Sequence, residues 1–252
     1  MNIKFILDGP ATGKRNMDLD LELHRHVLEA RYTAAIRFYT WDPWCVSLGK
    51  HQSADGLNQT ALQRLDLDVV HRPTGGRAVL HADEVTYCVC LPVASANQAQ
   101  MIYAAVHEML FNELSAIVPG LSYASVSSDL RQHYSSHQPV GQTCFSTHAK
   151  SEILWNGHKV VGSAQRVMDG VLLQHGSILC GPGHEQLSQV VCTSETDEHT
   201  VRAALDRTSA TLSQAANRPV THRDIASRFA AAEERMRHSL SAIASQVADA
   251  RR

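Results

Sequence analysis

The sequence predicts an α+β fold in which a mixed β-sheet is flanked by helices. Two features of the 252-residue chain lead to this prediction. Patterns typical of short strands and of amphipathic helices alternate up to about residue 180. From about residue 195 the sequence has only helical patterns. Strands, a helix, further strands and a final group of helices are typical of this class.

The first third of the chain is predicted to combine short strands with two helices. Residues 3–7 form a strand, and residues 15–31 form a helix with apolar side chains among charges. The turn signal Trp41-Asp42-Pro43 separates two β-rich runs. The remaining elements predicted here are strands at residues 35–39, 45–48, 69–72, 78–80 and 85–92 and a helix at residues 57–65.

The clearest helix covers residues 97–118. Apolar residues from Ile102 to Leu114 recur at near-helical spacing, and Pro119-Gly120 ends the helix. The segment 125–143 is polar and rich in Ser, His and Gln, so it is predicted to be a long loop. Loops of this length inside a domain are usually functional or mobile.

Two local signals place the later elements. Asn156-Gly157 suits the positive φ angles of a type I′ turn, which predicts a hairpin between residues 153–155 and 160–161. Residues 171–179 form another strand. Thr221 and Asp224 resemble a capping box, which predicts a helix from there to about Val247. The length suits one domain. Its single boundary signal, at residues 194–200, divides a main part (1–195) from a helical extension of the same domain (196–252).

Composition excludes several classes of function. The net charge is −2 with His neutral, which argues against a general attraction to nucleic acid or anionic membranes. The N-terminus lacks a signal-peptide pattern, and no segment approaches the roughly 18 apolar residues of a membrane span. We therefore expect a cytoplasmic protein with neither a nucleic-acid nor a membrane partner.

The cysteines and histidines do not predict a metal site. The six cysteines contain no C-x-x-C pair, so free and mostly buried thiols are expected. Cys88 and Cys90 lie on one face of a predicted strand. His133 and His137 have a spacing that could bind a metal, but they lack the glutamate of H-E-x-x-H and lie in a polar stretch.

Residues 71–81 (HRPTGGRAVLH) place two glycines between two predicted strands. Gly75 and Gly76 would let backbone amides come close to a ligand. Arg72 and Arg77, one on each side, can hold an anionic or carbonyl group. The alternative is a tight hairpin with solvent-exposed arginines.

Three further segments carry candidate chemistry. Lys159 precedes a run of small residues, and such a lysine can stabilise an oxyanion or favour a thiolate. Cys144 ends the polar loop, where an exposed thiol near a cation can become a nucleophile. Gly176 interrupts a strand and allows the close approach of a ligand. The simpler alternatives are a surface lysine, an inert loop cysteine and a packing glycine.

Together these segments resemble the lipoate–protein ligase and octanoyltransferase family, which is similar to biotin protein ligases. The matching text, in chain order, is IRFY (36–39), RPTGGRAVLH (72–81), VTY (85–87), CF (144–145), KVVGSAQ (159–165) and LQHGSIL (173–179). The resemblance implies a biotin/lipoate protein ligase-like catalytic domain over residues 1–195 with C-terminal helices. It also implies helices packed outside a mixed sheet and a tunnel for an acyl chain.

Within that family the chain resembles the cysteine-dependent octanoyltransferases. ATP-dependent ligases usually carry three glycines where this chain has Gly75-Gly76-Arg77, and they usually lack the cysteine matched by Cys144. They also carry an accessory domain, for which the stretch after Cys192 is short. Two departures bear on the choice of donor or acceptor: Ser146 stands where an acidic residue is frequent, and Asp20-Leu21 stands where Asp-Glu is frequent.

The resemblance implies transfer of an octanoyl group in two steps. Cys144 would attack the octanoyl thioester of acyl carrier protein, with Lys159 beside the sulfur and the carbonyl oxygen. The acceptor would be a lysine of a lipoyl domain, in 2-oxoacid dehydrogenases or the glycine cleavage H protein, as in lipoate biosynthesis. No ATP, metal or other cofactor is needed. Residues expected to shape the substrate site are Arg72, Thr74, Gly75, Gly76, Arg77, His81, Gly162, Ser163, Ala164, His175 and Gly176.

Some roles and functions stay open at this stage. His81 and His175 could equally form structural hydrogen bonds. Because the family's partner proteins are typically acidic, a local basic face is expected, with Arg72, Arg77, Lys150 and Arg166 as its candidates. The alternative functions are an ATP-dependent lipoate ligase, an amidotransferase between lipoyl-domain proteins, and a non-catalytic module that binds carrier proteins.

Overall fold

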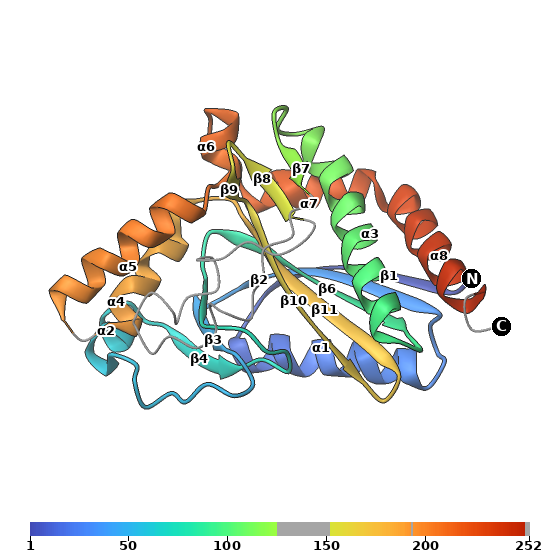
Figure 1. Cartoon of the computed structure of the whole chain (residues 1–252), viewed down its shortest axis with the longest axis horizontal. Helices are drawn as coiled ribbons and strands as arrows, with labels where there is room; N and C mark the ends of the chain where they lie inside the picture. The colour runs from blue at the N-terminus through green and yellow to red at the C-terminus, as the bar shows by residue number, and fades with distance from the viewer. Residues whose placement is uncertain (125–151, 193, 250–252) are drawn as a thin grey trace.

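The computed structural model describes residues 1–124, 152–192 and 194–249 (Figure 1). The segment predicted as a loop (125–143), Cys144, Lys150 and the pair His133 and His137 lie outside the described residues. Among the described helices, none is long and apolar enough to cross a membrane.

A five-stranded sheet with the order β1-β2-β6-β11-β10 forms the centre of the fold. β1 runs parallel to β2, whereas the other neighbours are antiparallel, so the prediction of a mixed sheet is confirmed. The strands are β1 (Ile3–Ala11), β2 (Ala34–Trp41), β6 (Glu84–Pro92), β10 (Val161–Met168) and β11 (Val171–Leu179).

Helices cover both faces of the central sheet, because side chains alternate between the faces along each strand. On one face α1 packs against Cys88 and Cys90 of β6, which confirms that these two cysteines share a face. On the other face α3, α7 and α8 form the main core with Val89 of the same strand (Figure 1). The bounds are α1 (Gly13–Leu28), α3 (Ala96–Ser115), α7 (His222–Ala231) and α8 (Glu233–Asp249).

A smaller sheet with the order β4-β3-β5 packs under its own helices and contributes to the candidate site. β3 pairs parallel with β4 and antiparallel with β5. The alternative of a tight hairpin at Gly75 and Gly76 is therefore wrong, because β3 lies between the strands that this loop joins. The elements are β3 (Cys45–Leu48), β4 (Asp68–His71), β5 (Val79–His81), α2 (Gln59–Arg64), η4 (Pro182–Gln186), α4 (Leu187–Val191) and α5 (Glu195–Thr208).

The hairpin predicted at Asn156-Gly157 is confirmed. These residues have φ angles of 48° and 80°, as a type I′ turn requires. The turn joins two strands of a third sheet and places Lys159 at the end of the second. The strands of this sheet are β7 (Ser122–Ala124), β8 (Glu152–Trp155) and β9 (His158–Lys159).

The C-terminal helices differ from the prediction in one respect. After the short α6 (Leu212–Ala216), the capping box of Thr221 and Asp224 is present, but the helix it opens ends at Ala231. A bend at Ala232 separates α7 from α8, and it allows Phe229 to pack on Phe38 of β2 with ring centroids 4.3 Å apart. Buried residues keep helical spacing through the bend, so the sequence pattern could not reveal it. The division at residue 195 stays a prediction.

Candidate functional site

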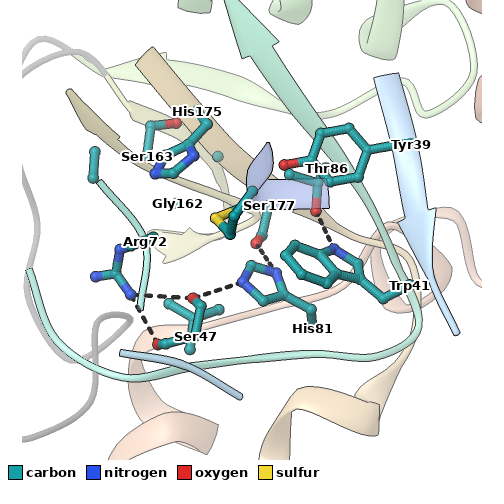
Figure 2. A pocket seen from close by; sticks show the side chains of 14 residues that line it. Tyr39, Trp41, Ser47, Arg72, His81, Thr86, Gly162, Ser163, His175 and Ser177 are labelled. Atoms are coloured by element: carbon teal, nitrogen blue, oxygen red, sulfur yellow. Dashed lines mark hydrogen bonds between the residues drawn. The ribbon is translucent and has the colours of Figure 1, made fainter. Parts of the chain in front are cut away.

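A cavity lies between the small sheet and strands β10 and β11 of the central sheet (Figure 2). It contains about 400 Å³ of empty space, part of which is open to solvent. Its lining residues are Met17, Tyr39, Trp41, Ser47, Arg72, Val79, His81, Thr86, Gly162, Ser163, Ala164, His175, Gly176 and Ser177.

Half of this lining was predicted from the sequence. The cavity brings together Arg72, His81, Gly162, Ser163, Ala164, His175 and Gly176. The other predicted residues among those described, namely Thr74, Gly75, Gly76, Arg77 and Lys159, do not line it. The structure adds an apolar and aromatic part of the wall that had not been singled out, formed by Met17, Tyr39, Trp41 and Val79.

Arg72 is a buried residue that binds the backbone of the loop containing Gly75 and Gly76. The residue is 5% exposed, and its guanidinium donates to the carbonyl oxygens of Ser47 at 2.9 Å, Gly75 at 3.0 Å and Arg77 at 2.6 Å. These bonds connect β3 to the loop and fix the loop's shape. Arg72 is therefore not part of a surface basic face, which corrects that expectation.

The same loop rests on the backbone that follows β3. A Cβ atom at Gly49 would lie 2.0 Å from the carbonyl oxygen of Gly76, and Lys50 donates its N–H to the Thr74 carbonyl at 2.9 Å. Gly76 has a φ angle of 96°, which favours glycine. Close backbone packing therefore accounts for the glycines at positions 49 and 76.

Asp20 is a buried charge centre behind the cavity. It is 0% exposed and accepts from Arg37 at 3.0 Å and from the Tyr39 hydroxyl at 2.8 Å. His175 lies between Asp20 and Thr74, with Nδ1 3.4 Å from the carboxylate and Nε2 2.7 Å from the threonine hydroxyl. Burial lowers the pKa of His175 although Asp20 acts in the opposite direction. Burial, followed by Asp20, raises the pKa of Tyr39 well above its usual value.

His81 is enclosed by polar and aromatic partners. Its Nδ1 lies 2.7 Å from Oε1 of Glu84, and its Nε2 lies 2.7 Å from the Ser47 hydroxyl. Its ring stacks on Trp41 with the centroids 4.1 Å apart (Figure 2). Glu84 is 2% exposed and also accepts from the Thr86 hydroxyl at 2.5 Å.

Ser163 and Gly176 meet where β10 pairs with β11. The Ser163 hydroxyl lies 2.7 Å from the Tyr87 hydroxyl and 2.8 Å from Nε2 of His107. A Cβ atom at Gly176 would lie 2.3 Å from that same serine oxygen and 2.6 Å from the Gly162 carbonyl oxygen. Strand packing therefore requires glycine at position 176.

Lys159 lies outside the cavity lining, in a buried ion pair. The residue is 5% exposed, and its Nζ lies 2.6 Å from Oε1 of Glu152, which is 2% exposed. The alternative of a surface lysine is therefore wrong. Because Cys144 lies outside the described residues, its placement beside Lys159 stays a prediction.

The carboxylates that hold these basic groups were not predicted as part of the site. Asp20 was noted only as a departure from a family pattern, and Glu84 and Glu152 were not singled out. A signal was present for the latter two, because each directly precedes an apolar strand segment. A carboxylate at the start of a buried segment needs a partner, since burying an unpaired charge is costly.

The fold is an α+β domain with a partly enclosed cavity between two sheets. The family model described as the lipoyl protein ligase A/B catalytic domain matches residues 12–233. The chain belongs to this family.

Curated relatives that carry the name Octanoyltransferase LipM are similar to this chain. The protein of Clostridioides difficile (strain 630) is 33% identical over 184 residues, which are 72% of this chain and 66% of that protein. The chain therefore spans just under two thirds of that relative. The protein of Exiguobacterium sp. (strain ATCC BAA-1283 / AT1b) is 31% identical over 221 residues, which are 85% of this chain and 79% of that protein.

Solved structures confirm the predicted fold. A bipartite lipoate protein ligase from Thermoplasma acidophilum superimposes with a TM-score of 0.69 at 16% identity, covering 99% of this chain and 92% of that one. A lipoate-protein ligase A bound with ATP superimposes with a TM-score of 0.66 at 17% identity, covering 99% and 95%. At these identities the likeness shows the fold alone.

Proposed function

We propose that this protein transfers an octanoyl group from acyl carrier protein to a lysine of a lipoyl domain, through a thioester on Cys144. The acceptors would be lipoyl domains of 2-oxoacid dehydrogenases or the glycine cleavage H protein. The similarity to proteins named octanoyltransferase, over 85% of the chain in one case, carries this proposal. We place the reaction in the cytoplasm, where thiols stay reduced.

The cavity supports the binding of an acyl chain. Met17, Trp41 and Val79 give the cavity an apolar part of its wall. An unbranched hydrocarbon chain gains from burial against such a surface, at about 0.8 kcal/mol per buried CH₂ group. The site has few charged groups in its lining, which suits a neutral acyl group.

Four of the other thiols of the chain are poor nucleophiles. The five described cysteines are free and buried. Burial raises the pKa of Cys180 to about 12 and that of Cys192 to about 11, and it raises the pKa values of Cys45 and Cys88 above their usual range. Since the thiolate is the reactive form, these four thiols react slowly near neutral pH. Their inertness supports Cys144 as the acyl carrier.

The reaction needs two exchanges at one carbonyl carbon. In the first, the Cys144 thiolate attacks the octanoyl thioester, the carbon–sulfur bond to the donor breaks, and the donor leaves as a thiol. In the second, the amine of the acceptor lysine attacks the new thioester, and Cys144 is released. Lys159 is the cationic partner of Glu152, and beside the sulfur it would stabilise the thiolate and the oxyanion of each step.

The first experiment is intact mass spectrometry after mixing the protein with octanoyl acyl carrier protein without ATP. We expect an octanoyl adduct on the wild type and on Cys192→Ala, and none on Cys144→Ala. Cys192→Ala is the matched control because it removes a buried thiol outside the cavity lining. Hydroxylamine should reverse a thioester adduct.

The alternatives give different results in the same assay. A product that forms only from free octanoate and ATP, and that persists in Cys144→Ser, would identify a ligase and refute the thioester. An adduct formed from an octanoylated lipoyl domain but not from acyl carrier protein would identify an amidotransferase. Binding of acyl carrier protein with no adduct in any arm would indicate a non-catalytic module.

A further inference from the structure

The geometry points to His81 as the acceptor of the proton that the incoming lysine amine must lose, with Glu84 as its positioning residue and the Ser47 hydroxyl as the relay. This inference rests on the proposed function and deepens it. It assigns the second step of the transfer, aminolysis of the octanoyl thioester, to a group other than Lys159.

The second step needs a proton acceptor. A lysine amine has a pKa of about 10.4, so near pH 7 only roughly one amine in a few thousand is neutral and able to attack. A base within hydrogen-bond reach can accept a proton from the amine as it attacks, and such a base typically contributes about 10²- to 10⁴-fold in rate.

The hydrogen bonds on one side of His81 have a fixed direction. The Trp41 indole N–H can only donate, and it donates to the Thr86 hydroxyl oxygen at 2.7 Å. Thr86 then donates its proton to Oε1 of Glu84 at 2.5 Å. Because a carboxylate only accepts hydrogen bonds, we assign the hydrogen to Nδ1, the His81 nitrogen that faces Glu84. Nε2 is then the basic nitrogen.

The hydrogen bonds on the other side agree with this assignment. The Arg72 guanidinium can only donate, and its Nη1 lies 3.2 Å from the Ser47 hydroxyl oxygen. The serine proton is therefore directed to Nε2 of His81, at 2.7 Å. Ser47, His81 and Glu84 form a directed chain in which a proton that enters at Ser47 is passed to the imidazole. Ser47 and His81 both line the cavity, as Figure 2 shows.

Glu84 and Trp41 hold the His81 ring from two sides. Glu84 is 2% exposed and receives both of its hydrogen bonds on Oε1, while Oε2 is buried with no partner among the described residues. A buried carboxylate that is only partly satisfied is costly, and the contact with Nδ1 of His81 at 2.7 Å offsets part of that cost. The face of Trp41 stacks on the imidazole, with the ring centroids 4.1 Å apart.

The proton and bond changes balance without a further reactant. One ammonium proton of the acceptor lysine passes to Ser47 as the Ser47 proton moves to Nε2 of His81, and it leaves from there to solvent. The neutral amine attacks the thioester carbonyl, and the carbon–sulfur bond breaks. The second proton moves from the nitrogen to the Cys144 sulfur, which leaves an amide and a free thiol.

Charged and titratable groups reach His81 from several elements. Glu84 on β6 is its direct partner, and Arg72, from the loop after β4, approaches the other side through Ser47. His175 on β11 interacts with His81 electrostatically, and burial lowers the pKa of His175, so it is neutral between about pH 7 and 9. The Tyr39 phenol on β2, which lines the same cavity, has a raised pKa and is also neutral there.

The test separates the two steps. Octanoyl-enzyme is formed from octanoyl acyl carrier protein, isolated, and mixed with a lipoyl domain that has one acceptor lysine, at pH 7, 8 and 9. For Glu84→Gln and for Ser47→Ala we expect transfer at pH 7 to fall about 10²-fold or more, and by a much larger factor than adduct formation. The deficit should persist at pH 8 and 9, because the fraction of neutral amine rises equally for the wild type and the variants and only the positioned base is impaired.

Glu113→Gln is the matched control, because Glu113 is another buried carboxylate that lies outside the cavity lining and pairs with Arg228 and Arg235. It should leave both steps unchanged at a temperature where it is folded. A deficit that affects both steps equally would show that Glu84 has only a structural role. If the wild type forms no octanoyl-enzyme at all, the proposed function itself fails.

Discussion

Adding one methyl group at Gly49 should displace the loop that carries Arg72. The new Cβ atom would lie 2.0 Å from the carbonyl oxygen of Gly76, and ordinary contact begins at 3.4 Å, so the two backbones must separate by the difference of about 1.4 Å. Neither atom belongs to a flexible side chain. Overpacking of this kind costs about 1–3 kcal/mol. At roughly 2–4 °C per kcal/mol for a chain of this size, the melting temperature should fall measurably.

The same displacement should affect activity more than stability. Arg72 bonds to the carbonyls of Gly75 and Arg77 at 3.0 and 2.6 Å, so a shift beyond 1 Å breaks these contacts at the cavity. A misplacement of that size can reduce a rate by about 10². Urea unfolding and octanoyl transfer should therefore both be measured for Gly49→Ala.

Two glycines serve as controls for Gly49→Ala. A Cβ atom at Gly75 or Gly56 would have nothing within 4 Å. Gly75→Ala tests stability within the same loop and should change it by less than about 1 kcal/mol. Gly56→Ala tests activity and should leave it unchanged. The reasoning is refuted if Gly49→Ala unfolds at the same urea concentration as Gly75→Ala.

Two further outcomes follow from the buried charges. Asp20→Asn removes the carboxylate that Arg37 and Tyr39 share, but Arg37 keeps Asp8 as a second carboxylate partner. We therefore expect the free energy of unfolding to fall by an amount near the lower end of the roughly 3–5 kcal/mol typical of broken buried pairs. A decrease below about 1 kcal/mol in urea unfolding would contradict this. Burial lowers the pKa values of His175 and His184 from 6.5, so below that pH the unfolded chain binds more protons than the folded one. The free energy of unfolding should therefore decrease as the pH falls from about 7.5 through 6.5, by no more than about 1.4 kcal/mol per pH unit for each histidine. A free energy of unfolding that does not change over this range would be inconsistent with buried neutral imidazoles.

Local signals predicted most of the fold. The Asn156-Gly157 turn, the helix that ends near Pro119 and the alternating strand around Cys88 depend on neighbouring residues, and all three are present. The topology of the small sheet depends on which distant strand enters between two others, and no local pattern encodes that. The alternative of a hairpin at the glycine pair was wrong for this reason.

The same distinction explains the candidate site. His81, His175 and Ser163 were predicted because they belong to short segments that resemble a family. Their partners come from elsewhere in the chain: Asp20 on α1 holds His175 on β11, and Ser47 on β3 holds His81 on β5. A sequence shows that a buried charge needs a partner, but the identity of the partner follows only from the packing of the elements.

Glu152 and Lys159 allow the role of a buried ion pair to be separated from its stability. Burying two charges costs about as much as their attraction returns, so replacing such a pair by apolar residues is often neutral or stabilising by about 1–4 kcal/mol, whereas removing one partner costs about 3–5 kcal/mol. We therefore expect Glu152→Leu to be strongly destabilised, because it leaves the Lys159 ammonium without the carboxylate 2.6 Å away. The double variant Glu152→Leu with Lys159→Met should recover most of that loss in urea unfolding and still form no octanoyl adduct. A double variant that is as unstable as the single variant would mean that the ion pair stabilises the fold. The result would then no longer support a catalytic role for Lys159.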